Sequence, residues 1–255
     1  MSSPTPAEPS GAQPSGASGV PSLSLTERRK AATRMEIARA AAGLFVRQGL
    51  RATRAEDIAQ AAGIAPRTFY RYFATKEEAV APLYAAGAER WTEAVRQAPA
   101  DLSVPEALEH AVRHTLTPGA GVSAASWEWV RTLIRLAASS PALSKVWAEV
   151  CHAEERSLAE VLAGRATGAP AAAGSSASAG TGGGDDNVAE AAVTSPELSF
   201  TGAVASAAVR VAVEAWAAGN APAHGPRGPA ALAMRNLGAL RDFPWGEIEG
   251  AVRAR

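Results

Sequence analysis

The chain of 255 residues contains a single cysteine, Cys151, which excludes an internal disulfide framework and a zinc site built from several cysteines. It also lacks an uninterrupted apolar run of about 18 residues, the length that spans a membrane. Even the apolar stretch 203–218 is interrupted by Arg210 and Glu214. No basic residue precedes Arg28, so the N-terminus does not have the pattern of a signal peptide. These absences predict a cytoplasmic protein with no membrane span.

Strand patterns are absent too, because β-branched residues nowhere alternate with polar ones for long. Two segments consist mostly of Pro, Gly, Ser and Ala, and we expect a disordered tail at 1–22 and a flexible loop at 164–195. Elsewhere the apolar residues recur at helical spacing. The sequence therefore predicts an all-α protein of about nine helices: 25–48, 54–62, 66–72, 76–97, 104–116, 124–138, 141–163, 196–218 and 229–241.

The starts of several predicted helices match the capping box, in which a hydroxyl accepts from a backbone N–H and a carboxylate reaches back to the cap. These are Ser24–Glu27, Thr53–Glu56, Thr75–Glu78 and Ser103–Glu106. Pro82 is expected to kink the helix at 76–97 or to delay its regular part.

The formal net charge of zero conceals a basic segment. Residues 25–78 contain eleven Lys or Arg and six Asp or Glu, a net charge of +5, so the rest of the chain sums to −5. This imbalance is typical of a protein that binds a polyanion through one module, although an ordinary solvated surface would give it as well.

The stretch 53–76, TRAEDIAQAAGIAPRTFYRYFATK, decides between these alternatives. Gly63 suits the left-handed conformation that ends a helix, Ile64 fills the turn, and Pro66 begins the next helix with its φ already set. Ala59 is small where the two helices would cross. This is the pattern of a DNA-binding helix-turn-helix at about 54–73, whose second helix enters the major groove.

The second helix of this motif is short and rich in groups that can contact DNA. Phe69 and Phe73 are four residues apart and should face inward. The residues left at the outside or at the helix ends are then Arg67, Thr68, Tyr70, Arg71 and Tyr72. Arginine can bind guanine bidentately there, and hydroxyls suit phosphates or base edges. For Tyr70 and Tyr72, packing as core aromatics is the alternative.

The sequence GIAPRTFYRYFATKEEAV resembles the recognition helix and following helix of the TetR family of bacterial transcriptional regulators, and LFVRQGLRATRAEDIAQAAG resembles the elements before them. The resemblance covers residues 28–90. It implies a three-helix DNA-binding domain at 25–75, followed by a helical ligand-binding and dimerisation domain at 76–245. It also implies a set of DNA contacts: Thr53, Arg54, Pro66, Arg67, Thr68, Tyr70, Arg71, Tyr72 and Lys76. Ala65 departs from the family, which usually has a Ser or Thr cap there.

All six tryptophans lie at or beyond position 91. The resemblance implies that this region binds a small effector, and the segments LIRLAASSPALSKVWAEV and HAEERSLAEVLAGR resemble the subgroup with acyl-CoA-like ligands, including regulators of the mycofactocin type. A drug-like antibiotic and an aromatic metabolite remain alternatives, and core packing is the alternative for each residue. The candidate pocket residues are Trp91, Trp127, Trp129, Leu133 and Trp147.

The last two long helices, 196–218 and 229–241, are the expected dimer interface, because two such pairs would form a four-helix contact. Their candidate faces are Val204, Ala207, Ala208, Val211 and Ala215 on the first, and Leu232, Met234, Leu237 and Leu240 on the second. A two-fold symmetric dimer would match a palindromic operator in double-stranded DNA.

Catalysis and metal binding have weaker support. His110 and His114 are four residues apart, but Ala111 stands where a metalloprotease has its glutamate. Cys151 and His152 are adjacent and would point about 100° apart on a helix. We therefore expect no enzyme activity, no cofactor and no metal, and predict a ligand-responsive repressor. The alternative is a helical small-molecule carrier or enzyme with a vestigial DNA-binding head.

Overall fold

The computed structural model describes residues 24–119, 124–167 and 196–245, and within these ranges the regular structure is helical, without strands. The elements are α1 (Leu25–Gln48), α2 (Ala55–Ala61), α3 (Pro66–Tyr72), the 3-10 turn η1 (Glu78–Val80), α4 (Ala81–Gln97), α5 (Val104–Leu116), α6 (Ala124–Ser139), α7 (Pro141–Thr167), α8 (Pro196–Ala218) and α9 (Pro229–Ala239). The predicted all-α fold is confirmed.

Several predicted helices match the structure at both ends, namely α1, α3, α5 and α8. The helix expected at 76–97 begins only at Ala81, after η1, because Pro82 is accommodated in the first turn of α4. Ser103 and Glu106 form the predicted capping box at the start of α5, with the Ser103 N–H donating to Glu106 Oε2 over 2.9 Å.

The start of the loop expected at 164–195 is wrong, since α7 continues to Thr167. Arg165 stabilises this extra turn by donating to the backbone oxygens of Ala98 at 2.8 Å and Pro99 at 2.8 Å, which follow α4. The rest of that loop and the tail expected at 1–22 lie outside the described residues.

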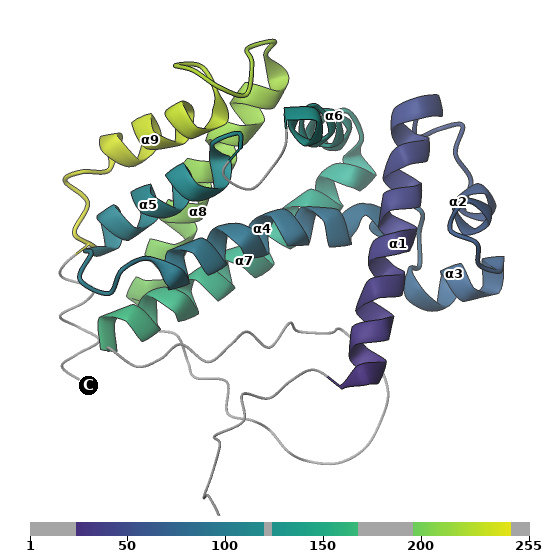
Figure 1. The fold of residues 1–255 in the computed structure, drawn as a ribbon, viewed down its shortest axis with the longest axis horizontal. Coiled ribbons are helices and arrows are strands. Elements are labelled where there is room, and N and C mark those ends of the chain that lie inside the picture. Colours follow the sequence, from purple (N-terminus) through teal and green to yellow (C-terminus); the bar gives the residue numbers. More distant parts are fainter. Residues whose placement is uncertain (1–23, 120–123, 168–195, 246–255) are drawn as a thin grey trace, which may run out of the picture.

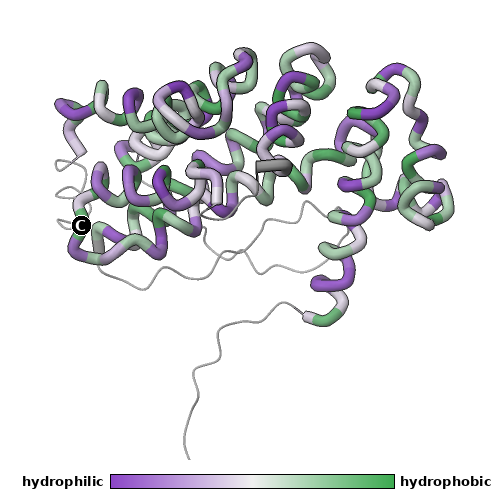
Figure 2. The backbone as a smooth tube through the Cα atoms, turned by 45° about the horizontal axis from the view of Figure 1, so that its top comes forward, coloured by the Kyte–Doolittle hydropathy of each residue, from purple (hydrophilic) through white to green (hydrophobic). Residues whose placement is uncertain are grey.

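The head of the molecule consists of α1, α2 and α3, with α2 and α3 on the side of α1 that faces away from the other helices (Figure 1). Ile37 and Phe45 of α1 are buried against Ile58 of α2 and Phe69 of α3. Along the helices the hydrophilic and hydrophobic colours of Figure 2 alternate, as expected of helices with one buried face.

The body of the molecule contains α4 to α9, and its core lies between α4, α5, α7, α8 and α9. The helix α8 is long and apolar enough to cross a membrane by length and composition alone, and no other helix of the described ranges is. Its apolar character is explained by its packing between α7 and α9. Where α7 and α8 cross, Gly202 is buried and leaves no room for a side chain, because a Cβ there would lie 2.8 Å from the backbone oxygen of Glu155.

The apolar core of the head continues into the body. Leu133 and Ala137 of α6 and Leu143 and Val146 of α7 are buried in the same cluster as the core residues of α1. Tyr84 of α4 is buried there too and donates a hydrogen bond to the backbone oxygen of Leu133 over 3.0 Å. The packing therefore crosses the boundary that the sequence predicts near residue 75.

Candidate nucleic-acid interface and internal cavity

The turn between α2 and α3 has the conformation that its sequence predicts. Gly63 adopts a φ of +68°, in the left-handed region that glycine favours. The Ile64 N–H closes the turn by donating to the Ala59 oxygen over 2.9 Å. Pro66 then begins α3, and Ala65 provides no side-chain cap. This turn fixes the direction of α3 relative to α2.

The predicted cap of α2 is wrong by one residue. Arg54 is the N-cap, and its N–H donates to the carboxylate of Asp57 over 2.8 Å. Thr53 is not available for this role because it is buried, 1% exposed, and its hydroxyl donates to the backbone oxygen of Gly49 over 2.9 Å. The Thr53 side chain thus holds the turn that ends α1, and a phosphate contact at this position would have to come from the main chain.

The helix α3 separates its aromatic residues between the core and the surface. Phe69 and Phe73 are buried, as predicted, whereas Tyr72 is half-buried and packs against the core of the head. Tyr70 is 53% exposed, and its hydroxyl donates to Glu56 of α2 over 3.4 Å.

The nine residues expected to contact DNA therefore fall into three sets. Thr53 is buried. The half-buried residues are Thr68, Tyr72 and Lys76, and the exposed residues are Arg54, Pro66, Arg67, Tyr70 and Arg71.

Two basic residues hold this surface in place through hydrogen bonds to backbone oxygens that the sequence patterns did not predict. The ammonium group of Lys76 donates to the backbone oxygens of Leu50 at 2.7 Å and Thr53 at 2.8 Å, which precede α2. Arg34 of α1 donates to the backbone oxygen of Tyr72 over 3.3 Å and lies 4.8 Å from the centre of the Phe73 ring. A cation at the C-terminal end of α3 also interacts favourably with the helix dipole.

The body contains a partly open cavity of about 200 Å³ between α4, α6, α7 and α8. Trp91, Trp127, Leu133 and Trp147, four of the five candidate pocket residues, lie on its wall. Trp129 does not, and it is 39% exposed. Because residues two apart on a helix point about 200° apart, α6 can direct only one of Trp127 and Trp129 inward.

The cavity wall is mainly apolar but carries buried polar atoms without a partner. Among the described residues, Trp91 Nε1, Trp127 Nε1 and Ser206 Oγ are buried and make no hydrogen bond. The third indole is different, since Trp147 Nε1 donates to Glu214 over 2.7 Å. Neither Ser206 nor the wall residue Glu154 has a local sequence pattern that could have predicted its position.

Glu154 is the acidic residue on this wall, and its environment favours the neutral acid. Burial, and then the nearby carboxylate of Glu89, raise the pKa of Glu154 to about 8, while Arg96 opposes the shift. The Thr92 hydroxyl also hydrogen-bonds Glu154. At neutral pH the wall therefore holds a carboxylic acid that is largely uncharged.

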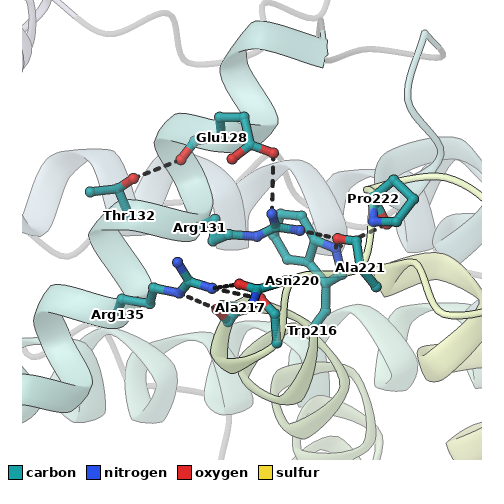
Figure 3. Close-up of polar contacts among 10 residues, drawn as sticks. Glu128, Arg131, Thr132, Arg135, Trp216, Ala217, Asn220, Ala221 and Pro222 are labelled. Carbon is teal, nitrogen blue, oxygen red and sulfur yellow. Dashed lines mark hydrogen bonds and ion pairs between the residues drawn. The ribbon is translucent and has the colours of Figure 1, made fainter.

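Two arginines of α6 fasten the C-terminal end of α8 (Figure 3). Arg135 donates to the backbone oxygens of Ala217 and Gly219, each over 2.6 Å. The guanidinium of Arg131 lies 4.2 Å from the centre of the Trp216 ring and hydrogen-bonds the Ala221 oxygen. Because α6 also carries cavity residues and head-core residues, it connects three parts of the molecule.

Residues 37–81, which include α2 and α3, match the family model of the bacterial regulatory proteins of the tetR family. This region of the chain therefore has the sequence and the helical geometry of a TetR-family DNA-binding domain. Over 92 residues the chain is 37% identical to the HTH-type transcriptional regulator TcmR of Streptomyces glaucescens. That match covers 36% of this chain and 41% of TcmR, less than half of either protein.

Several solved structures are similar in fold to this chain. One is Thermus thermophilus FadR, a TetR-family transcriptional repressor solved in complex with lauroyl-CoA. The match covers 81% of this chain and 92% of FadR, with a TM-score of 0.47 and 23% identity. The match with a TetR-family regulator from Streptomyces coelicolor covers 91% of this chain and 90% of that regulator, with a TM-score of 0.43 and 14% identity. The match with Salmonella enterica GusR covers 88% of this chain and 94% of GusR, with a TM-score of 0.44 and 15% identity.

The histidine pair of α5 and the thiol of Cys151 have ordinary surroundings. His110 and His114 are exposed and their rings stack 6.5 Å apart, and the described residues contain no group of three potential metal ligands. Burial raises the pKa of the Cys151 thiol to about 12, which disfavours the thiolate that nucleophilic catalysis needs.

Proposed function

We propose that this protein is a ligand-responsive transcriptional regulator of the TetR family, a homodimeric repressor that a small hydrophobic effector releases from a palindromic operator. The observation that carries the proposal is the surface of α3, where Arg67, Tyr70 and Arg71 are exposed while Phe69 and Phe73 anchor the helix in the core. A rigid short helix with exposed arginines suits readout of base edges in the major groove.

In this proposal the DNA contacts divide by chemistry. Arg67 and Arg71 read bases, Tyr70, Thr68 and Tyr72 contribute hydroxyls, and Pro66 lies against the groove. Arg54 and Lys76 contact phosphates, with Lys76 retaining its bonds to the turn before α2. Phosphate contacts supply affinity and depend on salt, whereas base contacts supply specificity.

A dimer interface on α8 is supported by a stripe of apolar residues that their own chain leaves partly uncovered. Val204, Ala207, Val211 and Ala215 recur at helical spacing and are half-buried or exposed, and Val211 is 49% exposed. The corresponding residues of α9 contribute less, because Leu232, Met234, Leu237 and Leu240 pack on the core of their own body. We therefore assign the larger part of the interface to α8.

An effector in the cavity would influence the head through residues that line the cavity and also belong to the apolar core of the head. Tyr84 and Leu133 line the cavity and are also buried in the core that includes α1. An effector that moves these two side chains changes the packing under the head. It shifts the equilibrium only by the difference between its affinities for the DNA-binding and released states.

The test is fluorescence anisotropy of the duplex found upstream of the protein's own gene, at fixed salt with excess unrelated DNA. Arg67→Ala and Arg71→Ala should each cost about 1–3 kcal/mol of binding and relax preference at one base pair. Arg113→Ala, on the exposed face of α5, is the matched control and should bind as the parent does. An unchanged specificity profile in both α3 variants would reject the assignment and favour a carrier.

A further inference from the structure

We propose that the cavity selects a neutral, flat aromatic ligand that carries a carbonyl or similar acceptor oxygen, which the indole N–H groups of Trp91 and Trp127 bind. This inference rests on the proposed function only in treating the cavity as the effector site. It starts from Trp91, Trp127 and Ser206, three residues that line the cavity and whose buried Nε1 and Oγ atoms have no partner among the described residues.

Three residues of the wall have buried polar atoms without a hydrogen-bond partner in the described part of the chain. Trp91, Trp127 and Ser206 are 5%, 3% and 7% exposed, so their polar atoms have lost water without gaining a protein partner. A buried donor in this condition is costly, and an acceptor that reaches it recovers the bond without further desolvation. Indole can only donate, so Trp91 and Trp127 require an acceptor on the ligand.

The shape of the wall favours an aromatic ligand. Tyr84, Trp91, Trp127 and Trp147 place four aromatic rings on the wall, and Tyr84 and Trp147 already pack edge to face at 5.1 Å. Aromatic walls favour flat aromatic ligands through stacked and edge-to-face contacts. The cavity of about 200 Å³ is smaller than ordinary drug-sized pockets and suits a compact fused-ring compound.

The charges on the wall favour a neutral ligand. Arg210 lies 3.6 Å from Glu214 in an ion pair, so its charge is already compensated. Glu154 is held largely neutral by its buried position. A cationic ligand would therefore meet the exposed Arg90 with no charged carboxylate on the wall to offset it, and an anionic ligand would find Arg210 already paired with Glu214. A neutral ligand avoids both costs.

The experiment compares two compounds of nearly the same shape, fluorenone and fluorene, which differ in the ketone oxygen. Equilibrium dialysis of the full chain should show fluorenone binding roughly two- to tenfold more tightly, as expected for one added hydrogen bond. In the double variant Trp91→Phe/Trp127→Phe, which keeps aromatic rings and removes both N–H groups, this preference should disappear. Trp129→Phe makes the same change outside the cavity and should retain it.

Four results overturn the proposal: equal affinity for the two compounds in the parent, no binding of either, an unchanged preference in the double variant, or tighter binding of cationic proflavine or of octanoyl-CoA. The comparison within the parent protein needs no variant to fold. Operator binding measured in parallel separates the two claims, because DNA binding without ketone preference rejects this inference alone. Ketone preference without DNA binding rejects the regulatory function alone.

Discussion

The crossing of α7 and α8 allows a stability change to be worked out from geometry. In Gly202→Ala the new Cβ would lie 2.8 Å from the Glu155 oxygen and 3.1 Å from both the backbone nitrogen and the Cβ of Ala159. None of these atoms is the end of a flexible side chain, so the helices must separate by a few tenths of an ångström. Overpacking of this kind costs about 1–3 kcal/mol.

The same substitution also gains helix propensity, about 0.5–1 kcal/mol when alanine replaces glycine inside a helix. Gly87→Ala in the middle of α4 isolates this gain, because nothing lies within 4 Å of the Cβ it would carry. We therefore expect Gly87→Ala to stabilise the protein and Gly202→Ala to be less stable than Gly87→Ala by about 1–3 kcal/mol.

Urea denaturation followed by circular dichroism, at one protein concentration, measures both free energies of unfolding. If the two variants gained equal stability, the close approach of α7 and α8 would be refuted. A lower stability in Gly202→Ala with an unchanged denaturant slope would support the calculation, because the compactness of the native state would then be preserved.

Three further predictions address single side chains. Lys76→Ala should weaken binding to every duplex by a similar factor and reduce the salt slope by about one in anisotropy titrations; a loss confined to one sequence would contradict the phosphate contact. Because burial raises the pKa of Glu154 from 4.5 to about 8, folding opposes its ionisation and stability should fall as pH rises through this window, reaching a constant loss above it. Glu154→Gln should reduce this loss of stability with pH, measured as the urea midpoint at each pH. Identical pH profiles of the variant and the parent would exclude Glu154 as its cause. Arg135→Ala removes hydrogen bonds at the end of α8 and should cost about 1 kcal/mol in the same assay; a change no larger than that of exposed Arg113→Ala would show that this fastening contributes little.

Local sequence patterns predicted the features that depend on neighbouring residues. The left-handed turn at Gly63, the start of α3 at Pro66 and the burial of Phe69 and Phe73 all follow from spacings of a few residues. The physical reason is that caps, turns and helix faces are determined within about one turn of a helix. The same patterns predicted both ends of α1, α3, α5 and α8.

The features that the sequence did not predict depend on residues far apart in the chain. Lys76 reaches backbone oxygens 23 and 26 residues away, and no local pattern encodes such a bond. Thr53 matched a cap by its sequence spacing, but its hydroxyl is used by the preceding turn. The sequence identified Trp127 and Trp129 as candidate pocket residues but did not show which of them points inward. That choice depends on how α6 is rotated against α8.

The continuity of the apolar core from α1 into α6 and α7 has a consequence for protein engineering. A chimera that joins this head to the body of another family member would place Ile37 and Phe45 of α1 over a foreign surface in place of Leu133 and Leu143. The part that can be exchanged intact is therefore larger than the helix-turn-helix. It includes the matching faces of α6 and α7, so a graft should carry those side chains along with the DNA-reading helix.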